Sequence, residues 1–88
     1  MSTISYSSAA MSAKSQMLKG AGFTYNFDRM VYFNRGAKKA FSAEFVEDHS
    51  VDELRERIAE KTNGANWQFY TNSSLSPAVK RELESILG

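Results

Sequence analysis

The residues best suited to chemistry stand together in the segment Asp48-His49-Ser50. Carboxylate, imidazole and hydroxyl are the three groups of a hydrolytic triad, in which the histidine takes the proton of the serine. Adjacent residues, however, do not place an imidazole between a carboxylate and a hydroxyl. Ser50 also opens the pattern Ser50-Val51-Asp52-Glu53, which is typical of a capping box at the start of a helix. We therefore interpret Ser50 as a helix cap and His49, the only histidine of the chain, as a boundary residue.

His49 and the acidic residues around it are the candidate ligands of a divalent cation. The acidic residues are Glu44, Glu47, Asp48 and Asp52. Their spacing matches no calcium loop, and no glycine stands among them to allow the sharp turn of such a loop. A run of carboxylates between a strand and a helix is more typical of a solvated surface that complements the helix dipole. We predict no catalytic residue, no cofactor and no metal site, with carboxylate catalysis as a minor alternative.

Cations and aromatic rings are interleaved between residues 25 and 41. The cations are Arg29, Arg35, Lys38 and Lys39, and the rings include Tyr25, Tyr32, Phe33 and Phe41. Exposed rings can stack on unpaired bases while cations follow the phosphates. A small sheet must also use one face of its rings for its own core, and cations on a hairpin protect a sheet edge. Nucleic-acid binding by an accessory protein is therefore our second hypothesis for function.

The charges of the chain are separated, although the net charge is only +1. From residue 14 to residue 39, six cations stand against one acid, and from residue 44 to residue 60, seven acids stand against two cations. Such polarity bears on association. Our first hypothesis is a small non-catalytic module that binds a protein partner, or a second copy of itself as a homodimer. The predicted surfaces are Arg29, Tyr32, Arg35, Lys38 and Lys39 on the basic side and Glu53, Glu56 and Glu60 on the acidic side. The alternative is that the two blocks pair within one chain.

The elements that must position these residues form a small α+β domain. Alternating aromatic residues predict an antiparallel β-meander at about 23–46, in which Gly36 supplies the positive φ of a hairpin turn. A further strand at about 66–71 completes a sheet of three to four strands, which is expected to be antiparallel because the connections are short. One side of this sheet is expected to pack against the two C-terminal helices. The helices are predicted at about 50–62 and 77–87, with an N-terminal helix at about 8–19.

Residues 29–39 resemble the second and third strands of a WW domain, in which an aromatic run and an asparagine lead into a basic hairpin. The resemblance covers eleven residues. The flanking tryptophans and the terminal proline of that family are missing here. The resemblance therefore implies a hairpin, and no site for proline-rich peptides is carried over.

Length and composition set the remaining limits. Eighty-eight residues predict a single domain, 1–88, in which the serine-rich residues 1–16 form a mobile N-terminal segment. The chain has no cysteine, which rules out disulfides and suits a reducing compartment. No apolar run is long enough to span a bilayer, and the first residues lack the apolar core of a signal peptide. We predict a cytoplasmic protein without membrane contact.

Overall fold

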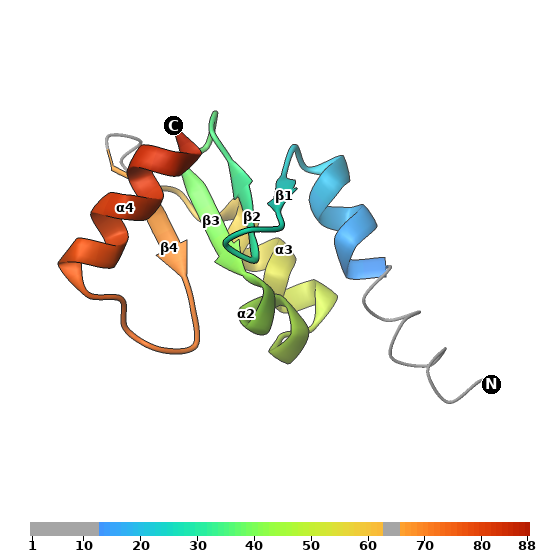
Figure 1. Cartoon of the computed structure of the whole chain (residues 1–88). Helices are drawn as coiled ribbons and strands as arrows, with labels where there is room; N and C mark the ends of the chain where they lie inside the picture. Colours follow the sequence, from blue (N-terminus) through green and yellow to red (C-terminus); the bar gives the residue numbers. More distant parts are fainter. Residues whose placement is uncertain (1–12, 63–65) are drawn as a thin grey trace.

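The computed structural model describes residues 13–62 and 66–88 and has an α+β fold (Figure 1). Its mixed sheet has the strand order β1-β2-β3-β4. The strands are β1 (Thr24–Asn26), β2 (Val31–Asn34), β3 (Lys39–Ser42) and β4 (Gln68–Tyr70), and the helices are α2 (Ala43–Asp48), α3 (Val51–Ala59) and α4 (Pro77–Leu87). Residues 13–20 are also helical. The start of the helix predicted at 8–19, and most of the segment predicted to be mobile at 1–16, lie outside the described residues.

Strands β1, β2 and β3 form the predicted antiparallel meander. Tyr25 lies opposite Tyr32, and Tyr32 lies opposite Phe41, so a row of rings crosses three strands on one face of the sheet. The positive φ of the β2–β3 turn, which we predicted at Gly36, is found at Lys38 (φ 55°). The reason is that the Asn34 side chain closes this turn, because Asn34 Oδ1 accepts a hydrogen bond from the backbone N–H of Ala37 at 3.0 Å. The left-handed conformation is then adopted by the last residue of the turn, Lys38.

The strand predicted to reach residue 46 ends at Ser42, where helix α2 begins. Ser42 Oγ accepts a hydrogen bond from the Phe45 N–H at 3.1 Å and so caps the helix. Phe45 and Val46 are both buried. Two consecutive residues can share the buried side of a helix, whereas consecutive residues of a strand point to opposite faces. Our prediction that the strand continues to residue 46 is therefore wrong beyond Ser42. It relied on the alternation of Phe41, Ala43 and Phe45, which is typical of a strand.

Helix α3 starts with the predicted capping box, because Ser50 Oγ accepts from the Glu53 N–H at 3.1 Å and Glu53 Oε1 accepts from the Ser50 N–H at 2.9 Å. The chain then returns to the sheet as β4. Lys39 lies opposite Gln68 in a parallel pair, so the predicted antiparallel pairing of this strand is wrong. The cause is the connection, since α2 and α3 carry the chain back to the end of the sheet from which β3 started.

The two faces of the sheet carry separate cores. The larger core, between the sheet and α2, α3 and the helical residues 13–20, consists of Leu18, Phe23, Tyr32, Phe41, Phe45, Val46, Leu54 and Tyr70. The smaller core, on the face covered by α4, consists of Val31, Ala40 and Leu87. Helices α3 and α4 therefore lie on opposite faces (Figure 1), and our prediction that they share one side is wrong. The reason is that strands β2 and β3 carry apolar side chains on both faces.

Helix α4 covers the range predicted at about 77–87, and it has Ser76 as its N-cap and Pro77 in its first turn. Ser76 Oγ accepts from the backbone N–H of Val79 at 3.3 Å. Two arginines of the meander, Arg29 and Arg35, contact this helix. In the ranges 13–62 and 66–88, no helix has the length and apolar character needed to cross a membrane.

Candidate binding pocket and charged surfaces

The predicted basic residues do not form one open surface. Arg29 Nη2 lies 2.8 Å from Glu82 Oε2 in α4. Arg35 Nε donates a hydrogen bond to Leu87 O at 2.6 Å, at the other end of the same helix. Both arginines therefore connect the hairpins of the sheet to α4. Among the residues that the structure describes, Lys38 is the one predicted cation whose side chain has no polar partner.

Two of the predicted surface residues are buried, and their placement on a surface is corrected here. Tyr32 is 6% exposed and belongs to the larger core, and Lys39 is 3% exposed. Lys39 Nζ donates three hydrogen bonds at the end of α3, to Arg57 O at 2.8 Å, Ile58 O at 2.6 Å and Glu60 O at 2.6 Å. The last carbonyls of a helix lack partners within it. Lys39 therefore acts as the C-terminal cap of α3.

Two electrostatic effects change the pKa of Lys39 in opposite directions. Burial lowers the pKa of Lys39, and the charge of the Glu60 carboxylate raises it in part. The three carbonyl oxygens and the negative end of the α3 dipole also favour the ammonium form. Lys39 and Tyr32 lie inside the protein, so the lysine cannot contact phosphates and the tyrosine ring cannot stack on bases. The support for nucleic-acid binding from this hairpin is correspondingly reduced.

The predicted acidic residues all lie on α3 or at its end. A hydrogen bond from the Ser50 backbone to the Glu53 carboxylate lowers the pKa of Glu53. Glu56 is exposed, and its Oε1 lies 3.6 Å from Arg57 Nη2. Exposed ion pairs of this length contribute little to stability, so Glu56 remains available to a ligand.

Glu60 contacts the sheet as well as α3. Its Oε1 accepts a hydrogen bond from the Tyr70 hydroxyl at 2.8 Å, and its Oε2 lies 3.6 Å from Arg57 Nη1. Burial, together with the hydrogen bond to Glu60, raises the pKa of Tyr70 to about 12. Glu60 thus holds the Tyr70 ring in place and is not free as a surface charge.

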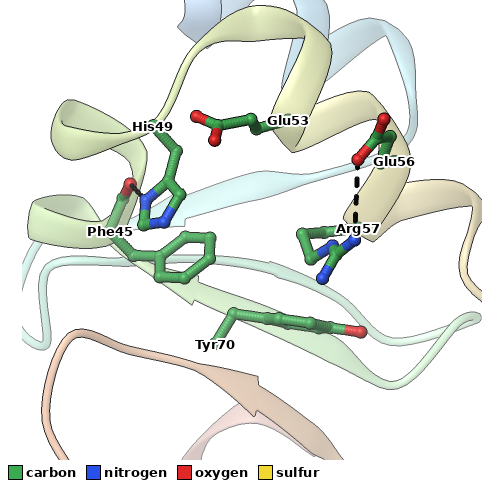
Figure 2. A pocket seen from close by; sticks show the side chains of 6 residues that line it. All are labelled: Phe45, His49, Glu53, Glu56, Arg57 and Tyr70. Carbon is green, nitrogen blue, oxygen red and sulfur yellow. Dashed lines mark hydrogen bonds and ion pairs between the residues drawn. The ribbon is translucent and has the colours of Figure 1, made fainter.

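Helices α2 and α3 and strand β4 enclose a pocket of ≈ 320 Å³ (Figure 2). Its lining residues are Phe45, His49, Glu53, Glu56, Arg57 and Tyr70. Figure 2 shows the rings of Phe45 and Tyr70 on one side, the Glu53 carboxylate on the opposite side, and His49 and Arg57 at the two ends. Two of the eight predicted site residues, Glu53 and Glu56, are therefore brought together here with rings that can form a floor.

His49 has a fixed orientation in this pocket. Its ring stacks on Phe45, with centroids 3.8 Å apart and planes inclined by 18°. Its Nδ1 lies 2.8 Å from Phe45 O. A carbonyl oxygen can only accept, so Nδ1 carries a proton, and Nε2 is the nitrogen that the neutral form of the ring would present as an acceptor. The lining contains no serine, threonine or cysteine that such a base could activate.

Arg57 closes the other end of the pocket. Its guanidinium lies between the carboxylates of Glu56 and Glu60, each at 3.6 Å, so its positive charge is compensated by its neighbours. Its Nε is buried and has no hydrogen-bond partner among the described residues. Since Glu53 is not needed to balance Arg57, the pocket retains negative charge above an aromatic floor. Such a site suits a cationic group on an apolar stem.

Four of the lining residues, Phe45, His49, Arg57 and Tyr70, were not among the predicted site residues. The spacing of His49, Glu53 and Arg57, four residues apart, could have indicated one face of a helix. No comparable signal marks Phe45, which we assigned to a strand, or Tyr70, which reaches the pocket only through the parallel pairing of β4 with β3.

Comparison of the chain with protein-family models, with curated proteins and with solved structures finds no match. Within residues 13–62 and 66–88, no group of three or more histidine, cysteine, aspartate or glutamate side chains is arranged to hold a metal ion. The function is therefore inferred from the geometry of the pocket and from the charges around it.

Proposed function

We propose that this protein is a protein-binding module, and that the pocket between α2, α3 and β4 receives a lysine or arginine side chain from a basic segment of its partner. The observation that carries this proposal is the combination of the Glu53 and Glu56 carboxylates with the rings of Phe45 and Tyr70. Carboxylates attract the cationic head, and aromatic faces accept both the cation and its methylene stem.

The surroundings of the pocket support the same partner. Helices α2 and α3 carry six exposed acidic residues, which we call the acidic surface: Glu44, Glu47, Asp48, Asp52, Glu53 and Glu56. Arg55, which is also exposed on α3, lies 3.9 Å from Asp52 in an ion pair of little strength. Three of the chain's own cations are engaged elsewhere, since Arg29 and Arg35 contact α4 and Lys39 caps α3. The acidic surface is thus uncompensated by the basic hairpin. A surface of this kind steers a basic partner and speeds its association.

The same proposal places the protein in the cytoplasm, because a chain without cysteine suits a reducing compartment. The proposed role of the protein is non-catalytic. The His49 imidazole is then part of the wall of a binding pocket, where its Nε2 can accept a hydrogen bond from a guanidinium or an ammonium.

The test is a fluorescence-anisotropy titration with a labelled peptide of alternating lysine and glycine, at low and at high ionic strength. The pocket variant is Glu53→Gln with Glu56→Gln, in which glutamine at position 53 can still complete the capping box. The matched control, Glu47→Gln with Asp52→Asn, removes two charges from the same acidic surface outside the pocket.

We expect the pocket variant to weaken peptide binding about tenfold, which corresponds to about 1.4 kcal/mol, and the control variant to weaken it much less. Equal losses of peptide affinity in both variants would show that binding depends on a diffuse electrostatic surface and not on the pocket. Absence of binding at low ionic strength would remove the proposal. A labelled single-stranded DNA in the same assay tests the nucleic-acid hypothesis directly, since binding there would favour it.

A further inference from the structure

The layer between α4 and the sheet contains a hollow of ≈ 250 Å³, which we call the apolar hollow. Its walls come from β2, β3, β4 and α4, and this helix lies across the sheet (Figure 1). The apolar side chains that line it are those of Val31, Ala40, Phe69, Leu75, Val79 and Leu83. Protein interiors are close-packed and contain few voids larger than a water molecule. A hollow of this size under a helix is therefore a candidate site for an apolar group of a ligand.

The polar groups that line the apolar hollow have partners within the chain. Ser42 Oγ caps α2, and Thr71 Oγ1 donates to the backbone carbonyl oxygen of Ser73. Arg29 Nη2 lies 2.8 Å from Glu82 Oε2, so the two charges at the hollow compensate each other. The apolar hollow therefore carries no net charge, and it suits the hydrocarbon part of a ligand.

A second hollow, of ≈ 320 Å³, adjoins the first and differs from it in chemical character. We call it the polar hollow, and its lining residues are Phe69, Thr71, Asn72, Ser73, Ser74, Leu75 and Lys80. Phe69, Thr71 and Leu75 line both hollows, so the two meet at these side chains. A ligand that occupies one hollow is therefore next to the other.

The charge of the polar hollow comes from a lysine. Of the described residues that line this hollow, Lys80 alone is charged. The side chains of Ser73, Ser74 and Lys80 have no polar partner among the residues that the structure describes. The nearby carboxylate of Asp48 lies outside the lining and already accepts a hydrogen bond from Asn72 Nδ2 at 2.6 Å. An ammonium group with hydroxyl donors beside it attracts an anionic group.

We propose that the two adjoining hollows bind a free fatty acid of medium chain length, with its hydrocarbon chain in the apolar hollow and its carboxylate at Lys80. Burial of methylene groups supplies affinity for the chain, and the charge of Lys80 selects a carboxylate over an alcohol. The volume of the apolar hollow suits one chain, which favours a free acid over a two-chain membrane lipid. Neither hollow uses a residue that lines the pocket between α2, α3 and β4, so this inference goes beyond the proposed function and can fail independently of it.

The test is isothermal titration calorimetry of the full chain with hexanoate, octanoate and decanoate, each below its micelle concentration. We expect the affinity to rise about fourfold with each added methylene group, as burial of apolar surface predicts. At low ionic strength, decanol should bind more weakly than decanoate. Trp67 is the one tryptophan of the chain, and its ring stacks on Phe69 with centroids 6.2 Å apart, so its fluorescence should change on binding.

The apolar hollow is tested by Val79→Phe, which fills it from α4 and should weaken decanoate binding at least about tenfold. The matched control is Ile86→Phe. Ile86 lies on the same helix and is as exposed as Val79, at 39%, but it lines neither hollow. Since both positions are exposed, circular dichroism of the two variants should be unchanged.

The polar hollow is tested by Lys80→Gln. We expect this variant to weaken decanoate binding about fivefold at low ionic strength and to leave decanol binding unchanged, because decanol has no charge for the ammonium to attract. Arg81→Gln is the matched control, since Arg81 is the next residue of α4, is also exposed, and lines neither hollow.

Hydrogen exchange locates the ligand within the fold. Decanoate that lies between α4 and the sheet stabilises the closed position of the helix, so exchange of the α4 amides should slow when decanoate is added. Exchange of the Val79→Phe variant should not respond to decanoate at the same concentration.

Three outcomes would overturn the proposal: no binding of decanoate, an affinity that is independent of chain length, or equal losses in Val79→Phe and Ile86→Phe. Decanol that binds as tightly as decanoate, or a Lys80→Gln variant that binds decanoate like the wild type, would overturn the assignment of the carboxylate to Lys80. Sedimentation of the protein with phosphatidylglycerol vesicles would replace the free acid by a membrane lipid. Peptide binding by Val79→Phe should stay at the wild-type level, which keeps this result separate from the test of the acidic pocket.

Discussion

Lys39 combines two features that rarely occur together, because it is 3% exposed and its ammonium group donates three hydrogen bonds. A buried lysine is costly unless its charge is satisfied. Here three carbonyl oxygens at the end of α3 satisfy it, of which Arg57 O also accepts from the Glu60 N–H at 3.3 Å. The lysine in turn supplies a donor to the last carbonyls of the helix. The residue therefore connects β3 to α3 at the end where Glu60 and Tyr70 also meet.

This role of Lys39 can be tested by substitution. Lys39→Met keeps the methylene stem but removes the donor for three carbonyl oxygens, and we expect it to lower the free energy of unfolding by about 2–3 kcal/mol. The measurement is urea denaturation monitored by circular dichroism. Lys38→Met is the control, since the side chain of Lys38 has no polar partner among the described residues, and it should change stability by less than about 0.5 kcal/mol. Equal effects in the two variants would contradict the capping role.

At the scale of elements, the junction at Ser42 decides the architecture. The chain leaves β3 and enters α2 without a loop, so Phe45 and Val46 turn into the larger core instead of extending the sheet. The short α2 and the longer α3 then form the crossover that makes β4 parallel to β3. The pocket is a consequence of this path, because its walls come from α2 and α3 and its floor includes the last residue of β4.

We expect Ser42→Ala to lower the free energy of unfolding by about 1 kcal/mol, because the Phe45 N–H loses the acceptor that caps α2. Ser42→Asp should retain most of the stability, since aspartate is also an effective N-cap. Thermal denaturation of both variants makes the comparison. If residues 43–46 continued the strand, as the sequence pattern suggests, alanine and aspartate would rank in the opposite order, because aspartate is disfavoured in strands.

At the scale of the whole molecule, the two faces of the sheet are unequally packed. Among the described residues, the larger core is a cluster of eight buried residues, whereas the cluster under α4 has three, with Leu83 of α4 also buried. A hollow of ≈ 250 Å³ lies between α4 and the sheet, lined by side chains that include Val31, Phe69 and Leu83. Arg29 and Arg35 contact α4 at two points, the Glu82 carboxylate and the Leu87 carbonyl oxygen. We infer that α4 is the less stable layer.

Hydrogen exchange should show this difference directly. We expect the amides of α4 to exchange through local opening, with lower protection than those of β2 and β3, because α4 buries only Leu83 and Leu87. Arg35→Ala removes the hydrogen bond to Leu87 O and should accelerate exchange in α4 while leaving the strands unchanged. Protection in α4 equal to that of the central strands would show that the fold opens as one unit.

Most local features were predictable because their signals lie within a few residues of one another. The Ser50–Glu53 capping box, the Ser76-Pro77 helix start and the alternation in the meander each follow from neighbouring side chains. The orientation of β4 and the sides on which α3 and α4 pack were not predictable in this way. Both depend on the course of the chain between elements, for which short connections were a misleading guide.

The amino-acid sequence by itself determined where the helices begin, which residues alternate in the strands, and that basic and acidic residues occupy separate stretches. Only the tertiary structure decided how those charges are used. Lys39 meets the end of α3 across 18 to 21 residues of sequence, and Arg29 meets Glu82 across 53. Charge separation along a chain carries no information about such distant contacts, because folding can bury a cation, pair it or expose it. The lysine and the two arginines found partners away from the acidic surface, where Asp52 has an exposed ion pair with Arg55 of the same helix.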